Sequence, residues 1–419
     1  MLINFHDFSP LFAQASPMFD PAGLAPIPAP LWFVQFFKVL GFVLHILAMN
    51  IWFAGIPLIL LMMIFGQKSG RRFIKRMFSQ LPIIMAFGIN FGIVPLLFVQ
   101  TIYYKPFYTA TILMAWHWMM VLPLVMIAYY GLYIAAFSVG KENKVGQTFF
   151  AGLIASVCLL LVAYIMVNAM SLMGRPDTMV AIWHQGQTFA GTDAAGATYG
   201  LGINSVDPTL WYRYGTMFGL AMTTVAFWTV FDAMVLIPKR KEKTSEELQA
   251  DDAYRRWAGS FAVVVAWIGG AVAVACFYQY IGCVQSAPAT AACFGEEGNQ
   301  KFQYLIYAAM FAPFLAAIGL TCAKLFRTGR FVTVIGITLC QLVALATFAI
   351  ARQWIQNLEI SQVTPITQFA ENTQLEPIYT SPLVVFLVLF VLGALVIAWM
   401  IRQMAIAPNA AAPNRRDDG

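Results

Sequence analysis

Apolar runs long enough to cross a bilayer recur along the chain and alternate with shorter polar segments. A helix needs about 20 apolar residues to span the hydrocarbon core of a membrane. The pattern predicts nine such spans, at residues 38–66, 81–103, 109–137, 148–173, 210–237, 257–282, 302–325, 331–354 and 382–404. We therefore expect an all-α polytopic membrane protein whose transmembrane domain covers residues 31–404.

The overall composition fits this class of protein. Hydrophobic residues make up 60% of the chain and charged residues 11%, whereas soluble domains have about 25% charged residues. The net charge of +6 would also be compatible with nucleic-acid binding. The lysines and arginines, however, are distributed as membrane topology requires, so no nucleic-acid partner is expected and the surrounding partner is membrane lipid.

The basic residues predict the orientation of the chain. Cytoplasmic segments of membrane proteins carry the excess of Lys and Arg. With the N-terminus outside, 19 of the 25 basic residues fall on the cytoplasmic side. This orientation places a proline-rich arm (residues 1–30) and three long loops (174–209, 283–301 and 355–381) on the outer side, and a tail (405–419) in the cytoplasm. So large an outer surface suggests a partner on that side.

Two of the four histidines, His45 and His117, lie inside predicted spans. An ionisable side chain in such a span is costly unless it faces the protein interior, a cavity or a cofactor. At a rise of about 1.5 Å per residue, they lie roughly 9 and 14 Å below the outer boundary. Two imidazoles at a similar depth could ligate the iron of a b-type haem, bind another metal centre or hydrogen-bond a quinone. Alternatively, both are buried neutral histidines bonded to an oxygen atom.

Several residues near His45 could support a bound group. One stripe at helical spacing consists of Lys38, Gly41, His45 and Trp52. Gly41 would leave room for a flat group, and Lys38 could reach a carboxylate on that group or extend to lipid phosphate. Arg213 and Arg352, at the outer ends of the fifth and eighth spans, could pair with haem propionates or a quinone oxygen, or serve at the surface.

The cysteines suggest an oxidising outer compartment. Cys283 and Cys293 flank a short segment on the predicted outer side, where a disulfide can form, although two free thiols remain the alternative. The chain has no CxxCH motif, which excludes covalent attachment of a c-type haem at such a motif.

Three stretches resemble subunit I of the cytochrome bd quinol oxidases. FVLHILAMNIWFAG is similar to the first helix of that family, in which a histidine ligates haem; FGINFGIVPLLFVQ resembles the second helix, and DPTLWYRYGTMFGLAM the start of the fifth. Nine spans with the N-terminus outside is also the family topology. The whole chain resembles bd-like membrane proteins that accompany multihaem c-type cytochromes. The resemblance implies bd-like helical bundles, a haem b ligated by His45 and a place in the bacterial inner membrane.

The chain also departs from the family pattern. Thr216 stands near the position of a haem-ligating histidine, and the Gly-Arg-Gln-Pro-Trp signature is reduced to Ala351-Arg352-Gln353-Trp354. The glutamates of the family's third helix have no counterpart, and no methionine can be matched to the other axial ligand. The resemblance therefore implies one haem site at His45, or a scaffold with none, rather than a complete terminal oxidase.

We expect, on this basis, a membrane subunit of a hetero-oligomeric respiratory complex. It would exchange electrons between the quinone pool and a periplasmic cytochrome c or other redox subunit, and would act as part of a quinol-linked oxidoreductase. A cofactor-free anchor for a periplasmic redox partner is the main alternative. A transporter is a third possibility, disfavoured because the spans hold few carboxylates and their polar residues cluster toward the outer half.

Overall fold

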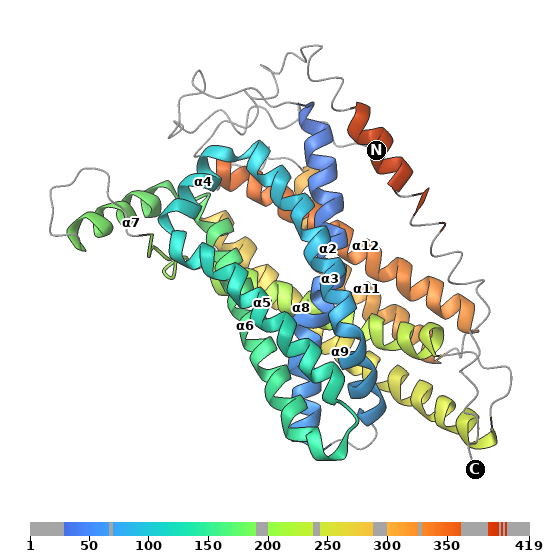
Figure 1. Ribbon diagram of the computed structural model, residues 1–419. Helices are drawn as coiled ribbons and strands as arrows, with labels where there is room; N and C mark the ends of the chain where they lie inside the picture. Colours follow the sequence, from blue (N-terminus) through green and yellow to red (C-terminus); the bar gives the residue numbers. More distant parts are fainter. Residues whose placement is uncertain are drawn as a thin grey trace.

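The computed structural model describes residues 29–66, 70–189, 200–237, 244–287, 300–325, 329–361, 384–393, 395–396 and 399 (Figure 1). Every regular element in these ranges is helical. This confirms the expected all-α class. The predictions that concern residues 1–28 and the tail 405–419 lie outside the described ranges.

Eight helices are long and apolar enough to cross a membrane, and they match the first eight predicted spans. They are α2 (Leu31–Ile64), α3 (Arg71–Ile102), α5 (Ala115–Ser138), α6 (Val145–Leu172), α8 (Leu210–Phe231), α9 (Ser245–Ser286), α11 (Gln300–Leu325) and α12 (Arg330–Ser361). A shorter apolar helix, Val384–Gly393, falls where the ninth span is expected. The count of nine and the orientation of the chain stay predictions.

The shorter elements among the described residues include α4 (Tyr104–Leu113), the 3-10 turn η4 (Glu142–Lys144) and α7 (Pro176–Phe189). In Figure 1, α7 points away from the bundle of long helices. It lies within the predicted loop 174–209, of which residues 190–199 are outside the described part.

The helix α8 lies at the centre of the bundle. It packs against α2, α6, α9, α11 and α12. Its contact with α9 is especially close, because a Cβ atom added at Gly219 would lie 2.4 Å from the backbone nitrogen of Ala273. Likewise, a Cβ atom at Gly269 would lie 2.7 Å from the carbonyl oxygen of Gly219. Small residues that let two backbones touch are a common device of membrane helices.

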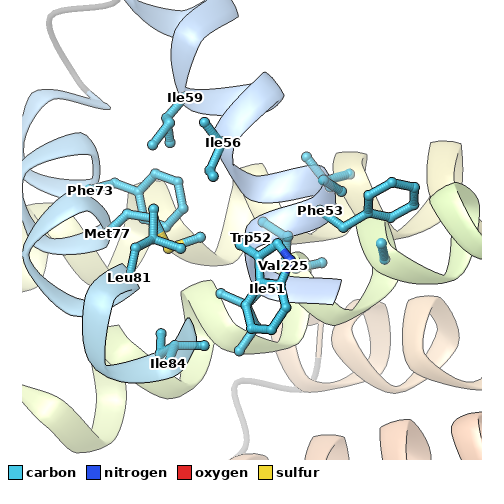
Figure 2. Packing of buried hydrophobic residues seen from close by; sticks show 14 of the residues in the cluster. Ile51, Trp52, Phe53, Ile56, Ile59, Phe73, Met77, Leu81, Ile84 and Val225 are labelled. Atoms are coloured by element: carbon cyan, nitrogen blue, oxygen red, sulfur yellow. The ribbon is translucent and has the colours of Figure 1, made fainter. Parts of the chain in front are cut away.

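The largest apolar cluster joins α2, α3 and α8 (Figure 2). Aromatic and branched side chains of α2 interlock there with Phe73 and Met77 of α3 and Val225 of α8. The indole of Trp52 fits against α3 only because residue 88 is glycine: a Cβ atom at Gly88 would lie 2.0 Å from the ring. Packing of this kind replaces lipid contacts with denser protein contacts.

A polar contact in the middle of the bundle ties α2, α8 and α12 together. The side-chain amides of Asn50 and Gln341 each donate a hydrogen bond to the hydroxyl oxygen of Thr224, at 2.9 Å in both cases. All three side chains are fully buried. Polar residues are thus not confined to one end of the bundle, contrary to the expectation that they cluster in the outer half.

One end of the bundle, here called the Asp232 end, is closed by a charged cluster. Asp232 begins η5 (Asp232–Leu236), a π-helical turn that continues α8. Its carboxylate accepts two hydrogen bonds from Arg76, at 2.6 and 2.7 Å, and others from Gln80 and Tyr254. A second ion pair, between Arg72 and Asp251, lies beside it. Asp232 is therefore a buried structural anchor rather than an exposed interfacial residue.

Candidate functional site

The opposite end of the bundle, here called the Glu359 end, holds most of the residues singled out from the sequence. Glu359 lies in the last turn of α12 and is almost fully buried. Its carboxylate accepts two hydrogen bonds from Arg213, at 2.5 and 2.6 Å, one from Arg175 at 3.2 Å and one from the hydroxyl of Tyr280 at 3.2 Å. This carboxylate is fully engaged by protein donors.

A second carboxylate, Asp207, lies in the segment that precedes α8. It accepts hydrogen bonds from the backbone nitrogen and the hydroxyl of Thr209, at 2.8 and 2.7 Å, and lies 3.5 Å from Arg175. Burial would raise the pKa of Asp207, but Arg175, Arg213 and the bonds from Thr209 outweigh burial and lower the pKa below its ordinary value. Asp207 is therefore held in its charged form.

Arg213, at the start of α8, is turned toward these carboxylates. Besides its bonds to Glu359, it donates to the hydroxyl of Thr209 at 2.8 Å and its guanidinium stacks 4.5 Å from the ring centroid of Tyr280. Its charge is balanced within the protein. A role of Arg213 toward propionates or a quinone stays a prediction.

Lys38 points into the protein rather than toward lipid. Its side chain is only 2% exposed. The ammonium group donates to the side-chain oxygen of Gln356 at 2.9 Å and lies 4.3 Å from the ring centroid of Tyr103. Tyr103 is itself held by α12, because its hydroxyl bonds to Asn357 and accepts from Gln353 at 2.7 Å.

Gln356, Asn357 and Glu359 belong to a stretch that sequence reasoning placed in an outer loop. The predicted eighth span ends at residue 354, whereas α12 continues to Ser361 and residues 353–361 are buried. Hydropathy marks amides and carboxylates as loop residues, but here each has a polar partner inside the protein. The loop 355–381 therefore begins after 361 at the earliest, and residues 362–381 are outside the described ranges.

Arg352, one turn before Gln356, differs from the other arginines of this end. Its guanidinium lies 4.3 Å from the ring centroid of Phe42 on α2. It is half-buried and close enough to act electrostatically on both Lys38 and His45. Within the described residues it makes no hydrogen bond and no ion pair.

His45 faces α3. Its Nδ1 atom and the carbonyl oxygen of Gly88 are 2.8 Å apart. Since a carbonyl oxygen only accepts hydrogen bonds, Nδ1 donates and carries the proton of the neutral imidazole. The lone pair then resides on Nε2, which has no hydrogen-bond partner in the described part of the chain. The ring lies against Gly92, where a Cβ atom would come within 2.8 Å of it.

The stripe predicted on α2 exists, but it packs against α3. Gly41 provides no room for a flat group, because a Cβ atom there would lie 2.7 Å from the side chain of Val94. That expectation was wrong because α3 approaches closely along this stripe. Any group bound to Nε2 of His45 must approach from another side.

His117 lies near the start of α5. Its Nδ1 atom is buried and has no hydrogen-bond partner among the described residues. The helices α2 and α5 are not a closely packed pair, whereas α3 packs against both. The structure thus gives no direct contact between the two histidines, and joint ligation of one iron gains no support from the packing.

Two further predictions concern a disulfide and a metal ligand. Cys293 lies outside the described residues, so its predicted disulfide with Cys283 stays a prediction. Within the ranges that the structure describes, no group of three or more His, Cys, Asp or Glu side chains could hold a metal ion. A haem iron needs only one or two protein ligands, so His45 remains the candidate for that role.

Comparison with known proteins adds no assignment. No family model matches the chain, and no curated protein matches it either. The likeness to subunit I of the cytochrome bd oxidases therefore stays a resemblance carried by the three quoted stretches.

Proposed function

We propose that this chain is the membrane subunit of a respiratory electron-transfer complex in the bacterial inner membrane, and that His45 ligates a b-type haem. The observation that supports this best is the hydrogen bond from His45 Nδ1 to the carbonyl oxygen of Gly88. Metal-ligating histidines commonly donate their other ring proton to such an oxygen, which fixes the ring and increases its basicity. Nε2 is left to bind iron.

The same hydrogen bond favours haem over a quinone. A quinone carbonyl oxygen needs a hydrogen-bond donor, and neutral His45 already uses its one ring proton on Gly88. Iron, in contrast, requires the lone pair that Nε2 retains. The residues present thus fit a haem ligated by one histidine, with Arg352 near enough to face its acidic groups.

The haem, when bound, would carry one electron at a time between the quinone pool and a periplasmic cytochrome c or other redox subunit. The chain's own contribution is to hold the imidazole ring by Gly88 and Gly92 and to exclude lipid from it. Its enzyme class would then be that of a quinol-linked oxidoreductase subunit. The support for this partner is the resemblance to bd-like proteins.

The test is a reduced-minus-oxidised visible spectrum of the purified chain, with haem quantified as the pyridine haemochrome. We expect a b-type signal that His45→Ala abolishes, because the ligand is lost, and that free imidazole partly restores. His184→Ala is the matched control, because His184 is exposed on α7; it should leave the signal unchanged. His117→Ala shows whether the second histidine also ligates the haem iron. An unchanged spectrum in His45→Ala would exclude the ligand assignment.

A cofactor-free anchor is the second candidate. The observation in its favour is α7, which stands away from the bundle and presents exposed side chains such as Asp177 and Gln185 (Figure 1). A colourless preparation that co-purifies with a redox protein, and loses that protein when Pro176–Phe189 is replaced by a flexible linker, would favour this reading over the redox one.

A further inference from the structure

The basic and acidic side chains at the Glu359 end do not balance. Four basic residues gather there, namely Lys38, Arg175, Arg213 and Arg352. The described carboxylates that face them are Asp207 and Glu359. This leaves an excess of two basic groups within a largely buried region.

Both carboxylates are already used. Glu359 is held by Arg213, Arg175 and Tyr280, and Asp207 by Arg175 and Thr209. Neither carboxylate can accept a hydrogen bond from a further cation without losing one of the bonds named above. The two described carboxylates of this end are therefore ion-paired with Arg175 and Arg213.

Among the residues that the structure describes, Lys38 and Arg352 are the two basic groups of this end that make no hydrogen bond or ion pair to a carboxylate. The ammonium group of Lys38 has a neutral amide oxygen and an aromatic ring as its neighbours, while Arg352 has the ring of Phe42. The two groups lie near each other, because Lys38 bonds to Gln356, which follows Arg352 by one helical turn on α12. Burying charges in this manner is costly unless an opposite charge compensates them.

We propose that Lys38 and Arg352 bind an acidic group, a carboxylate or phosphate, of a ligand that the protein takes up from the membrane or with its cofactor. The guanidinium of Arg352 offers a planar set of N–H donors suited to two oxygens of one acid group. Lys38 adds a point charge. One bound carboxylate or phosphodiester carries one negative charge and lowers the excess from two to one, and a ligand with two acid groups would remove it.

The charge balance holds for any acidic ligand, so the inference goes beyond the haem assignment. Two sources supply the same chemistry. One is the phosphate of an anionic phospholipid, and the other is a carboxylate carried by a cofactor bound at His45. A neutral ligand would leave both cations uncompensated.

The experiment compares the wild type with Arg352→Gln and Lys38→Met. Arg330→Gln is the matched control, because Arg330 is exposed at the other end of the same helix. Delipidated protein in a neutral detergent is mixed with phosphatidylglycerol or with diacylglycerol, which lacks the phosphate, and its thermal unfolding is followed. In a second arm the protein is titrated with haem or with haem dimethyl ester, in which both carboxylates are blocked.

We expect the wild type and Arg330→Gln to prefer one acidic probe over its neutral counterpart by at least tenfold in affinity. Preference for phosphatidylglycerol identifies a lipid phosphate, and preference for haem over its ester identifies a cofactor carboxylate. In Arg352→Gln, the ratio of the affinities for the acidic and the neutral probe should fall to about one. Lys38→Met should weaken it, while raising the unfolding temperature of the ligand-free protein because an unpaired charge is removed.

A wild type that treats acidic and neutral probes alike in both arms would overturn the proposal, even where the variants fail to fold. An undiminished preference in Arg352→Gln would do so as well. The result is separable from the haem assignment, because His45→Ala should lose haem binding yet retain any preference for phosphatidylglycerol.

Discussion

Charged side chains at the Glu359 end fall into two groups that differ in their partners. Arg175 and Arg213 are held by carboxylates, whereas Lys38 and Arg352 rest on amide and aromatic groups. The sequence identified Lys38, Arg213 and Arg352 as candidates, because a cation near a membrane span is costly without a role. It could not assign their partners, since Glu359 is distant along the chain and lies in a stretch that resembles a loop.

Asp207 should make the stability of the protein depend on acid pH. Its native pKa is lowered, so its contribution is complete above the unfolded pKa of about 3.9 and is lost as the pH falls through the native value. We expect Asp207→Asn to destabilise the protein at neutral pH by roughly 2–3 kcal/mol, because Arg175 and Thr209 lose a charged acceptor.

The measurement is the thermal unfolding of Asp207→Asn and wild type from pH 7 downward. The difference between the two should shrink below about pH 4. Asp177→Asn, at an exposed position on α7, is the control and should match the wild type throughout. A difference that grows on acidification would contradict the assignment of Asp207 as a native carboxylate.

At the scale of helices, the hydrophobic pattern predicted the positions of eight spans but not their ends. The helix α3 begins at Arg71 rather than 81, and α12 ends at Ser361 rather than 354. The additional turns carry Arg72, Arg76 and Glu359, whose charges are paired inside the protein. Hydropathy excludes such residues from a span because it contains no information about partners. The hydrogen bond of His45 to Gly88 depends on tertiary packing, which a hydropathy pattern does not contain.

The contact between α8 and α9 predicts strong sensitivity at Gly219. Gly219→Val should destabilise the protein by more than about 2 kcal/mol, because its side chain would collide with the backbone of Ala273, which cannot move aside. The check is the yield of folded protein and its unfolding temperature in detergent. Gly259→Val on α9, where a Cβ atom meets nothing within 4 Å, should be tolerated. Equal behaviour of the two variants would mean that the helices are further apart.

At the scale of the whole molecule, the two ends of the bundle have different charge chemistry. Among the described residues, the Asp232 end contains Arg72 and Arg76 in ion pairs, and the Glu359 end contains the excess of two basic groups. The sequence-based orientation puts the Asp232 end in the cytoplasm, because most basic residues fall on that side. The structure keeps the two sets of residues at opposite ends, as that orientation requires, and leaves the side of each end as a prediction.

Labelling of introduced cysteines tests the orientation directly. Val206, exposed beside Asp207, should react as cysteine with a membrane-impermeant thiol reagent in intact cells. Lys141, exposed in the turn between α5 and α6, should react as cysteine only after lysis. Both are made in a background in which Cys283, Cys293 and Cys322 are replaced by Ser, because Cys322 is an exposed native thiol and the other two lie on the predicted outer side. The reverse labelling pattern would invert the orientation and place the Glu359 end in the cytoplasm.

The central position of α8 has a consequence for the biogenesis of the protein. This helix is the least apolar of the eight spans and the most enclosed by protein. Its threonines are satisfied by neighbouring groups, such as Asn50 and Gln341 at Thr224. A nascent α8 would gain less from partitioning into lipid than the other seven spans. We therefore expect α2, which is made earlier and packs against α8, to stabilise its insertion before α9 emerges from the ribosome.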